Sequence, residues 1–195
     1  MVKQLLLVSC AAALAMTPLV AHAQGSNGSF DSWTGLRAGV ELGMNHNTYN
    51  GFDSSNAFMQ TLELGYDYQL NDHVVVGGDV YGDWTSNTSH AVHSFPGANA
   101  DFGYKGYGVD GLLGSPVGNF LPYVKLGYGR IDLSGDLSGS DNGLRYGAGL
   151  MWRLDTNSVL LFQLTYQKVS ISGNPGNGDF KNTNLTVGYN WFFNF

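Results

Sequence analysis

The sequence has little of what several protein classes depend on. It holds one cysteine, Cys10, so an internal disulfide is excluded. Charged residues make up only 12% of the 195 residues and the formal net charge is −6, so the basic face of a nucleic-acid-binding protein is missing. After the N-terminal segment there is no run of about 18 apolar residues, the length that a membrane-spanning helix requires. Nucleic-acid binding and a helical membrane anchor in the mature chain are therefore not expected.

What the sequence does contain is glycine and aromatic side chains. There are 28 glycines, about twice the ordinary share, and 13% of the residues are aromatic. So many aromatic and branched residues can drive burial, which excludes a disordered chain. The expected protein is a small folded domain with few charges.

The first residues have the features of a secretory signal peptide. Lys3 gives a positive start, residues 5–16 are apolar, and Ala21-His22-Ala23 is a small-x-small cleavage site. We therefore predict an exported protein with a signal peptide over residues 1–23, a short lead over 24–32 and one domain over 33–195. An alternative is a lipoprotein signal at Leu7-Val8-Ser9-Cys10. It is disfavoured because only nine residues precede Cys10.

Apolar and polar residues alternate along most of the remaining chain, as in strands with two different faces. Five segments alternate clearly and two are noisier: residues 34–44, 58–70, 73–84, 144–154 and 185–195, then 124–129 and 160–167. The remaining segment, 101–113, is the fourth along the chain. Its alternation does not show which residues face inward, because Lys105 and Asp110 cannot both do so without a bulge. Its facing stays open.

Short and long connections alternate between these segments. The short ones are Asn71-Asp72, 114–119 and 155–157, and the long ones are about 45–56, 87–98, 134–142 and 172–181. This rhythm is typical of a barrel in an outer membrane, with tight turns on one side and long loops on the other. The predicted fold is all-β: an eight-stranded antiparallel up-and-down transmembrane β-barrel.

The size of the side chains indicates which face points outward. An eight-stranded barrel has room inside for side chains but not for a wide channel, so the bulky set belongs outside against lipid and the glycine-rich set inside. Aromatic residues near the strand ends suit the two membrane interfaces: Tyr66, Tyr68, Trp84, Tyr146, Trp152, Tyr189 and Trp191. The sheet must close, because backbone groups cannot stay unpaired in a bilayer.

Charged residues fall on the inward face of the predicted strands. Arg37 and Glu41 lie on the first strand, most of the acids on the second and third (Glu63, Asp67, Asp79 and Asp83), and the other bases on the fifth and sixth (Lys125, Arg145 and Arg153). These side chains can form ion pairs across the narrow lumen. We predict a filled, roughly neutral interior that does not conduct freely.

Four segments carry a family resemblance: Trp33–Gly43 (WTGLRAGVELG), Leu121–Gly129 (LPYVKLGYG), Tyr146–Arg153 (YGAGLMWR) and Gly188–Phe195 (GYNWFFNF). Together they resemble the opacity-type outer-membrane β-barrel proteins. The last segment is similar to the assembly signal that barrel-insertion machinery reads, formed here by Gly188, Tyr189, Trp191, Phe193 and Phe195. Residues 160–169 depart from the family, since they lack its charged Arg/Glu-Tyr pattern.

The resemblance implies a surface protein of the outer membrane, in contact with its lipid, that supports envelope integrity or interacts with a host or another surface through its loops. Those loops carry aromatic residues that can make contacts: Tyr49, Phe52, Phe95 and Phe180. Two alternatives stay open: a narrow porin-like channel for small solutes and a lipid-modifying barrel enzyme.

Catalytic and metal-binding motifs are weak. His46, His90 and His93 lie in adjacent predicted loops, but without cysteine or a tight spacing they are better interpreted as solvated side chains. His93-Ser94 resembles the His–Ser pair of barrel lipid hydrolases, yet it lies in the middle of a loop beside Pro96. We therefore predict no enzyme, no metal and no cofactor.

Overall fold

The structure is a computed structural model that describes residues 32–49, 54–85, 89–92, 99–135, 139–171 and 178–193. Nine strands make up almost all of these residues: β1 (Gly35–Tyr49), β2 (Ser55–Asn71), β3 (Val74–Thr85), β4 (Ser89–Val92), β5 (Asn99–Gly114), β6 (Phe120–Gly135), β7 (Gly139–Arg153), β8 (Ser158–Ile171) and β9 (Gly178–Phe193). Within these ranges the chain has no helix with the length and apolarity needed to cross a membrane.

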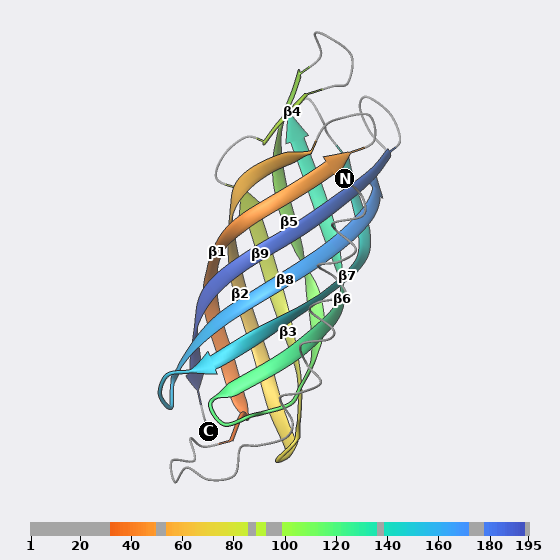
Figure 1. Cartoon of the computed structure of the whole chain (residues 1–195). Coiled ribbons are helices and arrows are strands. Elements are labelled where there is room, and N and C mark those ends of the chain that lie inside the picture. The colour runs from red at the N-terminus through yellow and green to blue at the C-terminus, as the bar shows by residue number, and fades with distance from the viewer. Residues whose placement is uncertain are drawn as a thin grey trace, which may run out of the picture.

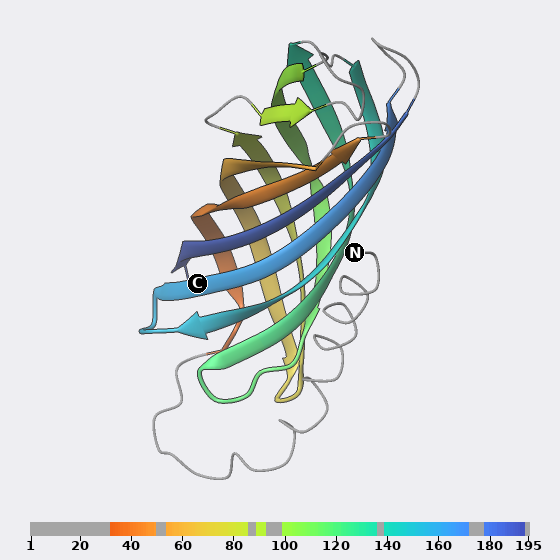
Figure 2. The same ribbon diagram turned by 45° about the horizontal axis from the view of Figure 1, so that its top comes forward.

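Eight long antiparallel strands close into a barrel (Figures 1 and 2). Consecutive long strands pair with each other, β3 pairs directly with β5, and β1 pairs with β9 to complete the ring. The four-residue β4 pairs only with the start of β5, beyond the end of β3. The predicted eight-stranded up-and-down barrel is confirmed, and β4 is a small addition to it.

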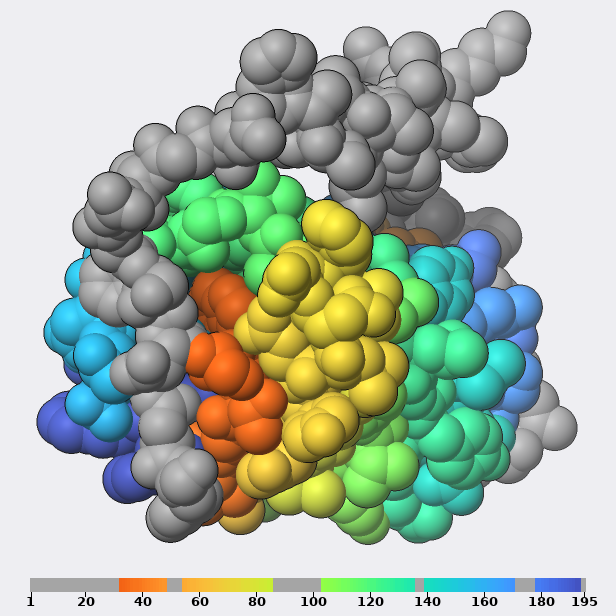
Figure 3. Space-filling model, turned by 90° about the horizontal axis from the view of Figure 1, so that it is seen from below, coloured from red at the N-terminus to blue at the C-terminus, as the bar shows by residue number. Residues whose placement is uncertain are grey.

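The connections divide the barrel into two ends. The turn end holds the short connections after β2, β5 and β7, together with Ser32 and Phe193; the opposite end is the loop end (Figure 1). Figure 3 looks onto the turn end, where the β2–β3 turn is yellow and the β5–β6 connection green. In the β7–β8 turn, the Asp155 carboxylate accepts hydrogen bonds from the backbone N–H groups of Asn157 (2.8 Å) and Ser158 (2.9 Å).

Several strands are longer at the loop end than the sequence predicted. The connection expected over 45–56 spans 50–54, the one over 134–142 spans 136–138, and the one over 172–181 spans 172–177. These segments are rich in Asn, Ser and Gly, which usually mark turns. Inside the barrel, however, asparagines pair across the β1–β9 seam: Asn45 donates to Asn184 (2.7 Å) and Asn182 donates to Asn47 (2.9 Å). These hydrogen bonds between side chains accompany the extension of β1 and β9.

The facing of the side chains is as predicted. Bulky apolar residues point outward, and Leu126 and Leu185 are 63% and 62% exposed on the outer wall. Charged residues such as Arg37 and Asp67 are fully buried inside. The middle of the barrel therefore turns bulky apolar side chains toward its surroundings and charged side chains toward the lumen.

The structure decides the facing of residues 101–113, which lie in β5. Tyr104, Asp110 and Leu112 are buried inside, whereas Lys105 and Tyr107 are exposed outside. The β5–β6 register runs without a shift from Phe102 to Gly114, so no bulge is needed. The alternation was unclear because the inward set of this strand mixes aromatic, aliphatic, acidic and glycine positions.

Buried apolar side chains lie at both ends of the lumen, which the sequence analysis did not predict; at the loop end they lie beside the asparagine pairs. At the turn end a buried cluster consists of Trp33, Val75, Leu112, Leu121, Tyr123, Met151, Val159, Leu161 and Phe192. At the loop end the rings of Tyr104 and Phe180 stack with centroids 6.3 Å apart. The prediction that Phe180 makes contacts from a loop is wrong: it lies in β9 and is fully buried, because the strand continues past the expected loop boundary.

Candidate functional site

The middle of the lumen is an ionic layer built around Arg37. Its Nε lies 3.1 Å from Asp67 Oδ2, its Nη2 lies 3.3 Å from Asp79 Oδ2, and its Nη1 contacts Glu63. All four side chains are fully buried. Alternation along β1, β2 and β3 brings them together, because every second residue of a strand points to the same face.

Lys125 reaches this layer from β6, on another part of the wall. Its Nζ lies 2.6 Å from Glu63 Oε2 and 2.8 Å from Asp79 Oδ2. Glu63 and Asp79 thus each contact Arg37 and Lys125, so the ion pairs link strands that are not neighbours in the sheet. Buried pairs of this kind add little net stability, but the loss of one partner leaves an uncompensated charge.

A second ionic group surrounds Arg145 of β7. Its Nη1 lies 3.6 Å from Asp83 Oδ2 and its Nε lies 3.7 Å from Asp110 Oδ2. The guanidinium carbon sits 3.6 Å from the centre of the Tyr81 ring, in the geometry of a cation–π contact. Asp83 also accepts a 2.8 Å hydrogen bond from the Thr61 hydroxyl.

Glu41 and Arg153, which the sequence placed in the same network, have different surroundings. The Glu41 carboxylate accepts hydrogen bonds from Gln163 Nε2 (2.9 and 2.7 Å) and from the Thr186 hydroxyl. Gln163 in turn accepts a 3.1 Å hydrogen bond from the Tyr123 hydroxyl. Glu41 is therefore held by amide and hydroxyl donors of β8 and β9.

Arg153 lies at the turn end among aromatic rings. Its guanidinium carbon is 4.2 Å from the centre of the Trp33 ring and 5.0 Å from that of Phe192. The two rings meet edge to face, at 87° and 6.2 Å between centroids. The Trp33 backbone N–H donates to Gln69 Oε1 (2.8 Å), which ties the start of the barrel domain to β2. We call Trp33, Arg153 and Phe192 the aromatic stopper.

Sequence reasoning missed several lumen partners. Asp110 was left out because the phase of its strand was unclear, and Tyr81, Gln163 and Thr186 carried no charge pattern that pointed to them. Asp110 adds a sixth buried acid to the five that the sequence analysis set against four buried cations, so the formal excess of acids in the lumen is two: Glu41, Glu63, Asp67, Asp79, Asp83 and Asp110 against Arg37, Lys125, Arg145 and Arg153.

Glycines make room for these large groups. A Cβ atom at Gly127 would overlap with the Asp110 carboxylate and with the Val109 carbonyl oxygen, and one at Gly129 would overlap with the Tyr81 hydroxyl. The glycine positions of β6 thus accommodate the acid and the ring that hold Arg145.

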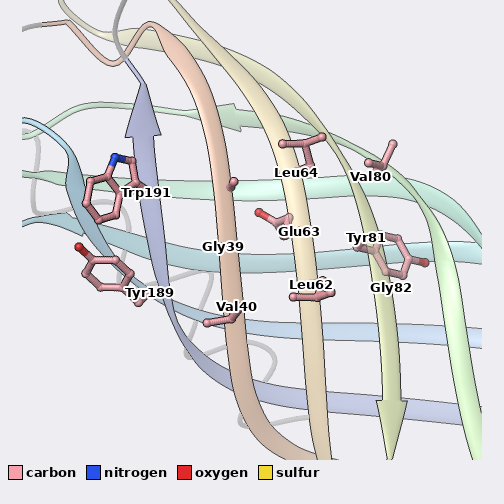
Figure 4. A pocket seen from close by; sticks show the side chains of 11 residues that line it. Gly39, Val40, Leu62, Glu63, Leu64, Val80, Tyr81, Gly82, Tyr189 and Trp191 are labelled. Carbon is pink, nitrogen blue, oxygen red and sulfur yellow. The ribbon is translucent and has the colours of Figure 1, made fainter.

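The outer wall carries an apolar groove of about 600 Å³ across β9, β1, β2 and β3 (Figure 4). Tyr189 and Trp191 lie on one side of it, and Leu62, Leu64 and Val80 on the other. Its lining is almost wholly aliphatic and aromatic, so this surface suits contact with hydrocarbon rather than with water.

The remaining predicted residues are placed only in part. Tyr189, Trp191 and Phe193 of the predicted assembly signal point outward, and Gly188 occupies an inward-facing position beside Glu41. Phe195, the cleavage site at Ala21 and Ala23, the pair His93-Ser94, and Phe52 and Phe95 lie outside the described residues, as do the side chains of Tyr49 and His90.

Of the three histidines that the sequence analysis considered as metal ligands, His46 is the one whose side chain the structure describes. Its Nδ1 shares a 2.7 Å hydrogen bond with Asn56 Oδ1 on the exposed outer side. In the part of the chain that the structure covers, no three His, Cys, Asp or Glu side chains are arranged to hold a metal ion.

Comparison with known proteins agrees with this geometry. Residues 5–193 match the family model described as outer membrane protein beta-barrel domain. The chain resembles the crystal structure of Neisserial surface protein A (NspA), with a TM-score of 0.62, 17% identity and coverage of 82% of this chain and 98% of that one. It also resembles the outer membrane protein OprG from Pseudomonas aeruginosa, with a TM-score of 0.54, 14% identity and coverage of 83% and 97%.

A third similar structure is that of the outer membrane enzyme PagL, with a TM-score of 0.48, 13% identity and coverage of 80% of this chain and 99% of that one. No curated protein matched the sequence. At 17% and 14% identity, the likeness to NspA and OprG reports the fold alone, and a fold by itself does not determine a function. With its family model matched over nearly the whole length, its eight-stranded closed barrel and its apolar outer wall, the chain belongs to the outer membrane protein beta-barrel domain family and is an outer-membrane protein.

Proposed function

We propose that this protein is a non-enzymatic surface barrel that supports the envelope and interacts with a host or another surface through its loop end. In outer-membrane barrels the short turns face the periplasm and the longer loops face the outside, so the loop end is the extracellular one. A scaffold of this kind carries its specificity in exposed connections.

The observation that carries this proposal is the change in outward side chains near the loop end. The last apolar outward residues of the eight long strands are Met44, Phe58, Trp84, Tyr107, Tyr128, Leu144, Tyr166 and Leu185. The next described outward residues are polar or charged: His46, Asn56, Lys105, Arg130, Asn142, Lys168 and Thr183. The strands therefore extend beyond the apolar band as a polar stem, which suits strand ends outside the hydrocarbon layer of the membrane.

The contents of the lumen argue against a channel. The ionic layer around Arg37 and Lys125 crosses the interior, the Tyr104–Phe180 stack lies toward the loop end, and the aromatic stopper lies toward the turn end. Permeation would require breaking buried ion pairs or displacing packed rings. Purified protein in planar bilayers should give no steady conductance, and resolved channels of constant size would contradict this part of the proposal.

The absence of catalysis is likewise part of the proposal. The lumen carboxylates Glu63, Asp67 and Asp79 contact cations, and the outer groove is lined mainly by apolar side chains. Overexpression in a Gram-negative host should leave the lipid A profile unchanged by mass spectrometry. A new deacylated or otherwise modified species would overturn the assignment.

The interaction itself is tested with connection variants. A non-adherent bacterial strain should gain adhesion to cultured epithelial cells or to polystyrene when it displays this protein. Replacing residues 50–54 and 93–98 with Gly/Ser linkers should abolish the gain, while heat-modifiable migration on detergent gels shows that the barrel still folds. Adhesion that is unchanged in the folded variant, or no gain with the wild type on either surface, would refute interaction through the loop end.

A further inference from the structure

The outward-facing cations are gathered at one end of the barrel. Among the described residues, four of the eight Lys and Arg side chains are buried in the lumen, and the other four point outward near the loop end: Lys105, Arg130, Lys168 and Lys181. The described part of the turn end instead carries the exposed acids Asp72 and Asp155. Asp132 and Asp179 also point outward at the loop end, so these four cations and two acids leave two net positive formal charges there, whereas Asp72 and Asp155 make the turn end negative.

Two of these lysines face each other directly. Lys168 of β8 and Lys181 of β9 are cross-strand partners, and both are exposed on the outer wall. Like charges in directly opposite positions destabilise a strand pair, so this arrangement calls for an anion between them.

One carboxylate lies beside this pair. Asp179 Oδ2 is 2.6 Å from Lys168 Nζ, and its other oxygen accepts a 3.0 Å hydrogen bond from Ser170. Within the described ranges no acid lies at ion-pair distance from Lys181. Two ammonium groups and one carboxylate leave one net positive charge, and Asp179 holds Lys168 in place.

The lysine pair sits directly above the apolar band. The next outward residues toward the turn end are the partners Tyr166 and Thr183, followed by the partners Leu164 and Leu185. The Tyr166 ring packs against Tyr146 with centroids 5.1 Å apart. Because tyrosines of outer-membrane barrels lie at the interface, ammonium groups one step beyond them lie level with lipid headgroups.

We propose that Lys168 and Lys181 form a binding site for a phosphoryl group of an anionic glycolipid in the outer leaflet of the outer membrane. The lipid's acyl chains pack along the apolar wall below the site, past Leu164 and Leu185. Asp179 orients Lys168 toward the phosphoryl oxygens, and Lys181 supplies the second ammonium donor. This site is additional to the surface interaction proposed above.

The cations on the other side of the barrel supply a matched control. Lys105 of β5 is the cross-strand partner of Asp132, and Arg130 Nε lies 2.9 Å from the same carboxylate. This group also has two cations and one acid, but its opposite charges face each other. It should bind an anion less well.

The experiment uses the full-length protein in nanodiscs of zwitterionic phospholipid, with bisphosphorylated lipid A as the probe. Native mass spectrometry gives the bound fraction over a range of probe concentrations. A basic residue at a membrane surface contributes about five-fold in affinity, so K168Q/K181Q should bind about thirty-fold more weakly. K168R/K181R should retain binding, and K105Q/R130Q should lose less than about three-fold.

Dephosphorylated lipid A should bind the wild type as weakly as lipid A binds K168Q/K181Q. Inorganic phosphate at the same concentration should not displace the probe, because it lacks the acyl contacts. Equal losses in K168Q/K181Q and K105Q/R130Q would show general attraction and overturn the site. Binding that is independent of the phosphates, or unchanged in a K168Q/K181Q barrel with normal heat-modifiable migration, would overturn it as well.

Discussion

The Lys125 ammonium lies 2.6 Å from the Glu63 carboxylate, and this contact joins β6 to β2 across the barrel although the two strands are not neighbours in the sheet. Backbone pairing connects each strand only with the next. The ion pairs of the central layer therefore add a second set of connections, which link opposite parts of the wall through the lumen.

Removing Lys125 should destabilise the barrel strongly. In Lys125→Met, Glu63 and Asp79 each lose a close cation while they stay buried, and breaking a buried pair in this way costs about 3–5 kcal/mol. Urea unfolding of the refolded protein in detergent, followed by tryptophan fluorescence, gives the free energy of unfolding. The exposed-site variant Lys105→Met should stay within about 0.5 kcal/mol of the wild type.

A second substitution should recover part of this loss. Glu63→Gln combined with Lys125→Met removes one of the two acids that then share Arg37 as their remaining cation, so the double variant should be more stable than Lys125→Met alone. Equal unfolding free energies for Lys125→Met and the wild type would contradict the paired geometry.

Trp33→Ala should weaken the turn end. It removes a buried indole that contacts both the Arg153 guanidinium and the Phe192 ring, and truncation of a buried aromatic to alanine costs about 3–5 kcal/mol. The same urea titration measures the effect. Trp33→Phe keeps a ring beside Arg153 and should lose less than half as much; a wild-type midpoint for Trp33→Ala would rule out a packed stopper.

Two glycine-to-alanine substitutions should change the free energy of unfolding differently, because one glycine lies on the inner face of the barrel and the other on the outer face. A methyl group at Gly127 meets the Asp110 carboxylate and a backbone carbonyl, so Gly127→Ala should cost about 1–3 kcal/mol. Gly82 points outward with open space around its Cβ position, and Gly82→Ala should be neutral within about 0.5 kcal/mol or slightly stabilising. The two variants are compared by their folding yield into detergent and by their unfolding midpoints. An equal loss of stability in Gly127→Ala and Gly82→Ala would contradict the close packing of the lumen.

The β7–β8 turn should give a pH-dependent contribution. Hydrogen bonds from the Asn157 backbone N–H and from the Ser158 hydroxyl and backbone N–H hold the pKa of Asp155 below its ordinary value of 3.8. A depressed native pKa stabilises the fold above the unfolded-state pKa, and this contribution is lost as the pH falls through the native pKa. Asp155→Ala should therefore unfold more easily than the wild type at pH 6, and the gap should narrow toward pH 2.5.

Asp72→Ala is the matched control for this measurement, since it removes an exposed acid from the β2–β3 turn at the same end. It should show a smaller gap at pH 6. An Asp155→Ala gap that does not change between pH 6 and pH 2.5 would show that the contribution does not come from the ionised carboxylate.

The two-residue alternation of the sequence was enough to predict the fold class, the alternation of short and long connections and the facing of seven strands. Those features are local: a strand with a bulky face and a glycine-rich face has one arrangement that a narrow barrel in lipid can accept. The same periodicity placed Arg37, Glu63, Asp67, Asp79, Asp83, Lys125 and Arg145 on the inner wall.

The tertiary structure alone decided which groups meet across the lumen. Partners such as Lys125 and Glu63 are 62 residues apart, and Gln163 and Glu41 are 122 apart, so their contact depends on the register of every strand between them. The same holds for the extension of β1 and β9 at the loop end, where asparagines that usually mark turns hydrogen-bond to each other inside the barrel. Side-chain alternation is a property of each strand, whereas the chemistry of the interior is a property of the closed ring.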